Sequence, residues 1–289
     1  MLFTEKIEGL VEVGIASQHV IDEKNTRPLN FMLITLSGGG KSQILLEKYG
    51  QVEGVKAFGD VTYARLADKW LDKIHRREIG TLIFPEFNKI LGRRASVAQN
   101  TVGLIDEVCE EGCPSIDLPY FSMTWNPPVR ANVIIGLTPS FYNAHLIDWW
   151  GFGFAQRFIP VTWSYSDYQE EKILHSIIKQ RHLKERVCNL KIRDKAINLP
   201  EEYSRRIKEH FTRRIVEDQT DYVEKLYMSK RLRFDRKLEK ELPFRTQQRL
   251  QKALKSIALL NGHTTAKKSD YIEFIDLFRF MNLKFREIS

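Results

Sequence analysis

Three consecutive glycines followed by Lys-Ser constrain the fold of this chain more than any other feature of its sequence. They lie in residues 35–42, after the apolar run of residues 31–34 and before a helix-like run that begins at Gln43. A strand, a glycine loop, Lys-Ser and a helix in this order are typical of a phosphate-binding loop, or P-loop. Glycine lets backbone N–H groups turn toward a phosphate at the positive end of the following helix. The sequence therefore predicts an α/β fold with a P-loop at the end of a strand.

Two side chains of the P-loop have predicted roles. Lys41 is expected to reach the β- and γ-phosphates of a nucleotide, and the Ser42 hydroxyl is expected to hold Mg²⁺. Thr35 stands where the usual motif begins with glycine, so a glycine-rich turn that binds nothing is the alternative. The predicted cofactors are ATP and Mg²⁺. The predicted nucleotide-binding residues are Ser37, Gly38, Gly39, Gly40, Lys41, Ser42 and Gln43.

The composition is that of a soluble globular protein. Hydrophobic residues make up 43% and charged residues 28% of the 289 residues. No apolar run approaches the ~20 residues that a membrane helix needs, and the first residues lack the regions of a signal peptide. We therefore expect an intracellular protein with no membrane partner. Neither the three cysteines nor the seven histidines have the spacing of a metal cluster.

The charge of the chain favours an acidic partner. The formal net charge is +8 at pH 7, and DNA is the predicted partner. Much of the excess falls between Lys225 and Lys255, where lysines and arginines recur. Because acidic residues interrupt this run, it can be either a solvated helix face or a phosphate-binding surface.

Short apolar runs and amphipathic helices alternate in the first half of the chain. Residues 31–36, 81–84 and 133–137 predict buried strands, and residues 63–74 carry one apolar helical face. This alternation predicts a parallel sheet covered by helices.

The pattern changes near residue 164, after which the chain is mostly charged and has helical spacing. Apolar residues repeat at this spacing in residues 203–215 and 250–258, among others. We therefore predict a P-loop α/β subdomain over residues 1–163 and an α-helical lid over residues 164–289.

A carboxylate follows the second predicted strand. At the position of Glu86, a carboxylate can help to hold Mg²⁺ and can position the water that attacks a phosphate. The usual motif here, Walker B, has Asp before Glu, whereas this chain has Pro85, which can neither ligate a metal nor accept a proton. We predict Ser42 and Glu86 as the Mg²⁺-binding residues. Either Glu86 acts alone, with Ser42 and water molecules completing the Mg²⁺ shell, or hydrolysis is weak; an exposed Glu without function is the alternative.

Several segments, in order, resemble the minichromosome maintenance (MCM) helicases. Residues 30–49 look like the P-loop strand and helix of that family, and residues 83–89 are similar to its Walker B segment, apart from Pro85. Residues 114–125 look like the hairpin before the sensor 1 strand, and residues 131–139 resemble that strand. The resemblance implies an AAA+ ATPase that works as a ring of identical subunits, predicted here as a hexamer.

The resemblance also implies roles for three further residues. Thr138 stands at the sensor 1 position, where the family has asparagine, and its hydroxyl can still orient a water molecule. Arg157 would be the arginine finger that enters a neighbouring subunit's nucleotide site, although it can equally be a structural arginine among its apolar neighbours. Arg249, with Arg245 as second choice, would be the sensor 2 arginine. The predicted catalytic residues are Glu86, Thr138, Arg157 and Arg249.

These features predict an ATP-driven, helicase-like ring that acts on DNA in the replication of a virus, plasmid or mobile element. The alternative is an ATP-switched AAA+ loader or transposition regulator that assembles on DNA without unwinding it. Pro85 and Thr138 favour this alternative, because both predict slow hydrolysis. A third hypothesis is a degenerate P-loop protein that binds no nucleotide and serves as an interaction scaffold.

Overall fold

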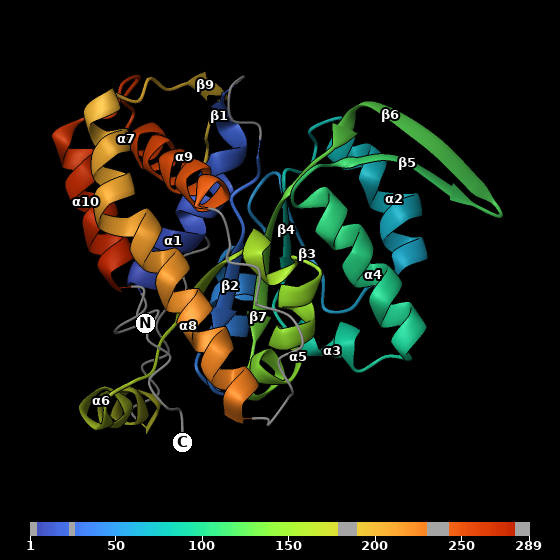
Figure 1. The fold of residues 1–289 in the computed structure, drawn as a ribbon, viewed down its shortest axis with the longest axis horizontal. Coiled ribbons are helices and arrows are strands. Elements are labelled where there is room, and N and C mark those ends of the chain that lie inside the picture. The colour runs from blue at the N-terminus through green and yellow to red at the C-terminus, as the bar shows by residue number, and fades with distance from the viewer. Residues whose placement is uncertain (1–4, 23–26, 179–189, 230–242, 281–289) are drawn as a thin grey trace.

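The computed structural model describes residues 5–22, 27–178, 190–229 and 243–280, and Figure 1 shows its fold. Five parallel strands form the central sheet in the order β3-β4-β7-β2-β8, which confirms the predicted α/β fold with a parallel sheet. The three predicted strands are present, although β2 ends two residues earlier than predicted, where the chain turns into the P-loop. The strands are β2 (Phe31–Ile34), β3 (Val55–Ala57), β4 (Thr81–Phe84), β7 (Asn132–Leu137) and β8 (Ile159–Thr162).

Side chains alternate between the two faces of the sheet, so each face packs against its own helices. In β2, Phe31 and Leu33 belong to one core, whereas Met32 and Ile34 belong to the other. In Figure 1, α1 and α9 lie on one side of the sheet, and α2 and α4 lie on the other. The first core includes residues of α1 (Glu5–Ala16), the π-helix η2 (Gln43–Lys48), α9 (Phe244–Leu260) and α10 (Lys268–Phe280). The second includes residues of α2 (Tyr63–His75), α3 (Asn88–Leu91), α4 (Ala95–Val108) and α5 (Pro139–Gly151).

The C-terminal helices share the first core with α1. Ile207, Phe211 and Ile215 lie in the same apolar cluster as Ile7 and Leu10, and so do residues of α9 and α10. Helices from both sides of the predicted boundary at residue 163 therefore pack into one core, and the division into two subdomains stays a prediction. Ile207, Phe211 and Ile215 belong to α7 (Glu201–Ile207), the π-helix η4 (Lys208–Thr212) and α8 (Arg213–Ser229), in that order.

A β-hairpin extends from the core beside α2 (Figure 1). It consists of β5 (Cys113–Leu118) and β6 (Phe121–Val129) and lies where the sequence predicts a hairpin. The remaining elements are the parallel pair β1 (Val20–Ile21) and β9 (Lys195–Ala196), the short 3₁₀ helices η1 (Ser17–His19) and η3 (Ala155–Arg157), and α6 (Asp167–Ile178). Within the described ranges, the structure contains no helix with both the length and the apolar character needed to cross a membrane.

The basic run between Lys225 and Lys255 is not one exposed face. Arg249 and Lys252 are buried, and Lys252 donates a hydrogen bond to the Arg27 carbonyl at 2.8 Å. Burial lowers the pKa of Lys252 to about 8. The part of the run in residues 230–242 lies outside the described residues.

Candidate phosphate-binding site

The carboxyl ends of three neighbouring strands bring most of the predicted site residues together. The P-loop follows β2, Glu86 lies just beyond β4, and Thr138 follows β7. Because β7 lies between β2 and β4, the strand end that carries Thr138 lies between the other two. The N–H of Thr35 donates to the Leu137 carbonyl at 3.3 Å, which ties the start of the P-loop to β7. Open α/β sheets bind ligands at this carboxyl edge.

The conformation of the P-loop accounts for its three glycines. Gly38 and Gly40 have φ angles of 82° and 84°, in the left-handed region that residues with a Cβ rarely adopt. A Cβ on Gly39 would lie only 2.6 Å from Cγ2 of Thr35. The N–H of Gly39 donates to the Leu36 carbonyl at 3.1 Å and closes a tight turn. The loop therefore has a shape that other residue types would strain.

The Lys41 side chain folds back onto the start of the P-loop. Its Nζ donates hydrogen bonds to the carbonyls of Thr35 at 2.7 Å and Leu36 at 3.1 Å. Burial lowers the pKa of Lys41 from 10.5 to about 8, while the negative charge of Glu86 opposes this shift. The ammonium is thus held at the loop, where a phosphate would stabilise its charged form.

Glu86 lies between the P-loop and a lysine that sequence reasoning does not single out. The Ser42 hydroxyl donates to Oε1 of Glu86 at 3.5 Å. Nζ of Lys89 lies 2.6 Å from Oε2 of Glu86, and the hydrogen bond to Glu86 raises the pKa of Lys89. The spacing of three residues between Glu86 and Lys89 is the signal that could have predicted this pair, since such residues are neighbours on a helical turn.

Ser42 and Glu86 fit a nucleotide-bound Mg²⁺ better than a metal site made by protein alone. They supply two neighbouring oxygens, and Mg²⁺ is usually bound by one or two carboxylates together with phosphates and water. Among the described residues, no group of three or more His, Cys, Asp or Glu could hold a metal ion. Pro85 adds no ligand, and its carbonyl faces Gly136, where a Cβ would lie 2.3 Å from the carbonyl oxygen.

Thr138 contributes a hydroxyl at the start of α5. Its Oγ1 lies 3.2 Å from Oγ of Ser140, and Thr138 is half-buried. Two neighbouring hydroxyls therefore lie at the predicted sensor 1 position. The sequence singles out only that of Thr138. Both can donate and accept hydrogen bonds.

Arg157 and Arg249 lie at the opposite edge of the sheet. Arg157 comes just before β8, and its carbonyl accepts a hydrogen bond at 3.0 Å from Asn30, the residue before β2. Arg249 reaches this amino edge from α9 and donates to the carbonyl of Gln156. The structure therefore brings neither guanidinium to the P-loop of its own chain.

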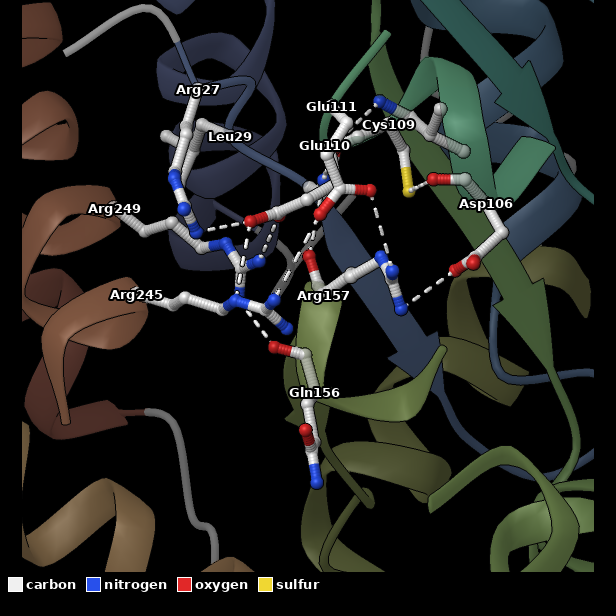
Figure 2. Close-up of polar contacts among 12 residues, drawn as sticks. Arg27, Leu29, Asp106, Cys109, Glu110, Glu111, Gln156, Arg157, Arg245 and Arg249 are labelled. Atoms are coloured by element: carbon white, nitrogen blue, oxygen red, sulfur yellow. Dashed lines mark hydrogen bonds and ion pairs between the residues drawn. The ribbon is translucent and has the colours of Figure 1, made fainter. Parts of the chain in front are cut away.

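Both arginines are buried in a cluster of ion pairs, which Figure 2 shows. Arg157 Nη1 lies 3.1 Å from Asp106, and its Nη2 lies 3.6 Å from Glu111. Burial raises the pKa of Asp106 to about 6, although Arg157 opposes this shift. Arg249 Nη2 lies 2.7 Å from Oε2 of Glu110. Two more arginines pair with the Glu110 carboxylate: Arg27 and Arg245.

This cluster joins the end of α4, the segment before β8, and α9. An arginine finger must present its guanidinium at the protein surface to reach a neighbouring subunit, whereas Arg157 is only 9% exposed. Arg249 is 1% exposed and equally enclosed. The roles of Arg157 as arginine finger and of Arg249 or Arg245 as sensor 2 therefore stay predictions, and in this arrangement all three side chains pair with carboxylates of the same chain.

No protein-family model matches the chain, and no curated protein matches it. Its function is therefore inferred from the chemistry of the site and the resemblance of its motifs.

Proposed function

We propose that the chain binds ATP with Mg²⁺ at the P-loop and hydrolyses it as an AAA+ ATPase. The observation that carries this proposal is the convergence of the P-loop, Glu86 and Thr138 at one edge of the sheet. These residues are far apart in the sequence, yet each follows one of three adjacent parallel strands. The strand of Thr138 lies between the strands of the P-loop and of Glu86, so its hydroxyl is carried to the same edge as both.

Each residue of the site has a role in this proposal. The N–H groups of Gly38, Gly40, Lys41 and Ser42 and the Lys41 ammonium bind the phosphates. Ser42 and Glu86 would hold Mg²⁺, which when bound offsets negative charge on the phosphates. Glu86 orients the attacking water by accepting a hydrogen bond from it, and Thr138 orients the same water or the terminal phosphate.

Hydrolysis is expected to be slow. Pro85 leaves the site without the aspartate of the usual Walker B motif. In addition, the Lys89 ammonium occupies one oxygen of Glu86, at 2.6 Å. The carboxylate therefore divides its hydrogen-bonding capacity between Lys89, Ser42 and the attacking water.

We further propose that the protein acts on DNA as a ring-shaped, helicase-like motor, predicted as a hexamer. The net charge of +8 and the order of the MCM-like segments support a DNA partner. The second candidate is a loader or transposition regulator that assembles on DNA without unwinding it. Two observations favour this candidate: the Glu86–Lys89 pair, and a hairpin tip at Pro119 and Tyr120 that carries no basic residue.

Titration calorimetry tests the first step. Wild type should bind ATP in the presence of Mg²⁺, and Lys41→Ala should lose most of this affinity. A wild-type chain that binds no ATP would leave only the scaffold hypothesis.

Hydrolysis and unwinding assays then separate the two candidates. DNA-stimulated hydrolysis together with unwinding of a forked duplex supports the helicase, whereas ATP-dependent assembly on DNA without unwinding supports the loader. Light scattering with and without ATP and DNA measures whether a ring forms.

A further inference from the structure

Two aromatic side chains near the end of β8 contact the backbone of the P-loop. Trp163 Nε1 and the Tyr165 hydroxyl both donate to the Gly39 carbonyl, each at 3.2 Å. In the other direction, the Thr35 hydroxyl donates to the Trp163 carbonyl at 2.7 Å. Trp163 is buried and Tyr165 is half-buried, so these hydrogen bonds are largely shielded from water. Three side-chain hydrogen bonds thus join the P-loop to one short segment of the chain.

The two bonds to Gly39 determine how one peptide group of the P-loop is oriented. A carbonyl oxygen has two lone pairs, and here Trp163 and Tyr165 both donate to it. Because the peptide group is planar and trans, the N–H of Gly40 points in the direction opposite to the Gly39 carbonyl. A loop that binds phosphate must present N–H groups to the anion, since an inward carbonyl oxygen would repel the phosphate oxygens. The aromatic pair therefore holds the carbonyl away and leaves the Gly40 N–H on the other side.

Thr35 completes this support at the position where the usual motif has glycine. Its hydroxyl makes the bond to Trp163, and its Cγ2 fills the space that a Cβ on Gly39 would need. Glycine at position 35 would lose both contacts. This departure from the usual motif therefore has a specific partner, Trp163, just after β8.

We propose that Thr35, Trp163 and Tyr165 are positioning residues that preset the P-loop for phosphate. This inference rests on the proposed binding of ATP at the P-loop. The three side chains act through the backbone of residues 39 and 40, so their loss should weaken phosphate binding without removing any group that contacts the nucleotide.

Conservative variants test this proposal by titration calorimetry with ATP and Mg²⁺. Trp163→Phe and Tyr165→Phe each remove one donor to Gly39, and Thr35→Val removes the hydroxyl but keeps the shape of the side chain. We expect each to raise the Kd for ATP about fivefold, the effect of one ordinary hydrogen bond. Thr35→Ser keeps the hydroxyl and should stay within about twofold of wild type by the same reasoning.

Matched controls separate positioning from general destabilisation. Trp150→Phe removes a buried indole N–H for which the described part of the chain offers no hydrogen-bond partner. Tyr222→Phe removes a hydroxyl of α8 that donates a hydrogen bond at 2.6 Å to Asn143 of α5. Both controls should leave the Kd for ATP unchanged, even where they lower the Tm as much as the Trp163, Tyr165 and Thr35 variants do. Binding of ATP should also change the fluorescence of wild type and of Trp150→Phe more than that of Trp163→Phe.

The outcomes are distinct. If wild type binds ATP, Lys41→Ala does not, and the Trp163, Tyr165 and Thr35→Val variants bind more weakly than their controls, the proposal stands. If these variants bind ATP as tightly as wild type, the three residues are only structural and the proposal is wrong, while the proposed function survives. A wild-type chain that binds neither ATP nor inorganic pyrophosphate overturns both.

Discussion

At the scale of single residues, two departures from the usual ATPase motifs have local physical reasons in this structure. Thr35 replaces glycine at the start of the P-loop and uses its hydroxyl to bond Trp163. Pro85 replaces the Walker B aspartate where the backbone lies against Gly136. The first departure adds a contact that supports the loop, whereas the second removes a metal ligand. We therefore expect ordinary affinity for ATP together with a low rate of hydrolysis.

The lowered pKa of Lys41 predicts that ATP binding depends on pH. With a pKa of about 8, the free lysine loses its charge as pH rises through this value, and a bound phosphate would raise the pKa again. Binding near pH 8 should therefore take up protons, and the Kd should increase between pH 7 and pH 9. Calorimetry in buffers with different ionisation enthalpies measures the uptake. Lys41→Arg, which stays charged, should bind with little proton uptake; equal uptake in both proteins would contradict the assignment.

Glu86 is expected to be needed far more for hydrolysis than for ATP binding. Glu86→Gln keeps the shape of the side chain but removes the carboxylate that, in the proposed mechanism, orients and deprotonates water. We expect kcat to fall by about 10²–10⁴-fold, the usual contribution of a general base. ATP affinity in the same variant should fall far less than kcat, because Lys41, the loop N–H groups and Ser42 remain and the Gln side-chain oxygen can still face Mg²⁺. Steady-state ATPase assays measure the first quantity and calorimetry the second; an active Glu86→Gln protein would remove Glu86 from the mechanism.

At the scale of elements, the position of Glu86 depends on the segment that follows β4. This segment passes close to β7. The Phe87 N–H donates to the Gly136 carbonyl at 3.1 Å, and Pro85 passes over the Cα of the same glycine. Gly136 lies in the middle of the sheet, where a glycine otherwise weakens a strand. The absence of a side chain at this position lets the chain cross β7 and carry Glu86 toward the P-loop.

Gly136→Ala should therefore destabilise the fold. Its Cβ would lie 2.3 Å from the Pro85 carbonyl oxygen, a backbone atom that cannot move away cheaply. We expect a loss of about 1–3 kcal/mol in the free energy of unfolding, the usual cost of overpacking. Gly103→Ala is the matched control, because Gly103 is exposed in α4 and a Cβ there meets nothing within 4 Å. Alanine should stabilise that helix by about 0.5–1 kcal/mol, so equal effects of the two changes in urea unfolding would contradict this account.

At the scale of the whole molecule, one buried carboxylate joins parts of the chain that are distant in sequence. Glu110 at the end of α4 pairs with Arg249 of α9, and Arg27 and Arg245 pair with the same carboxylate. Together with the core shared by α1, α9 and α10, this cluster fixes the C-terminal helices at the amino edge of the sheet. The P-loop lies at the opposite edge, so the ion-pair cluster and the proposed nucleotide site occupy different ends of the sheet.

Glu110→Gln should destabilise the whole fold. It leaves the buried Arg249 guanidinium without its negative partner, which typically costs about 3–5 kcal/mol. The matched control is Glu111→Gln, because the Glu111 side chain is 64% exposed, and exposed pairs contribute only about 0–1 kcal/mol. Thermal and urea unfolding measure both. A fold that tolerates Glu110→Gln as well as Glu111→Gln would show that the cluster is not a structural centre.

Much of the fold and part of the site could be predicted from sequence, because both depend on local patterns. Apolar runs bounded by turn residues predicted β2, β4 and β7, and helical spacing predicted α2 and α9. Once these strands are known to be parallel neighbours, the P-loop, Glu86 and Thr138 must share an edge. Lys89 was missed although its spacing from Glu86 was visible, because ion pairs on one helical turn are common and seldom functional.

The sequence by itself determined the strand and the glycine loop of the candidate P-loop, since strand, glycines, Lys41 and Ser42 are contiguous and their backbone preferences act locally. Only the tertiary structure decided where Arg157 and Arg249 lie, because their partners Asp106, Glu110 and Glu111 come from a different part of the chain. It also decided that Thr35 has a partner, since Trp163 meets it only after β2 and β8 have paired. Long-range contacts of this kind leave no periodic signal in the sequence, because their partners meet only when distant segments pack together as the chain folds.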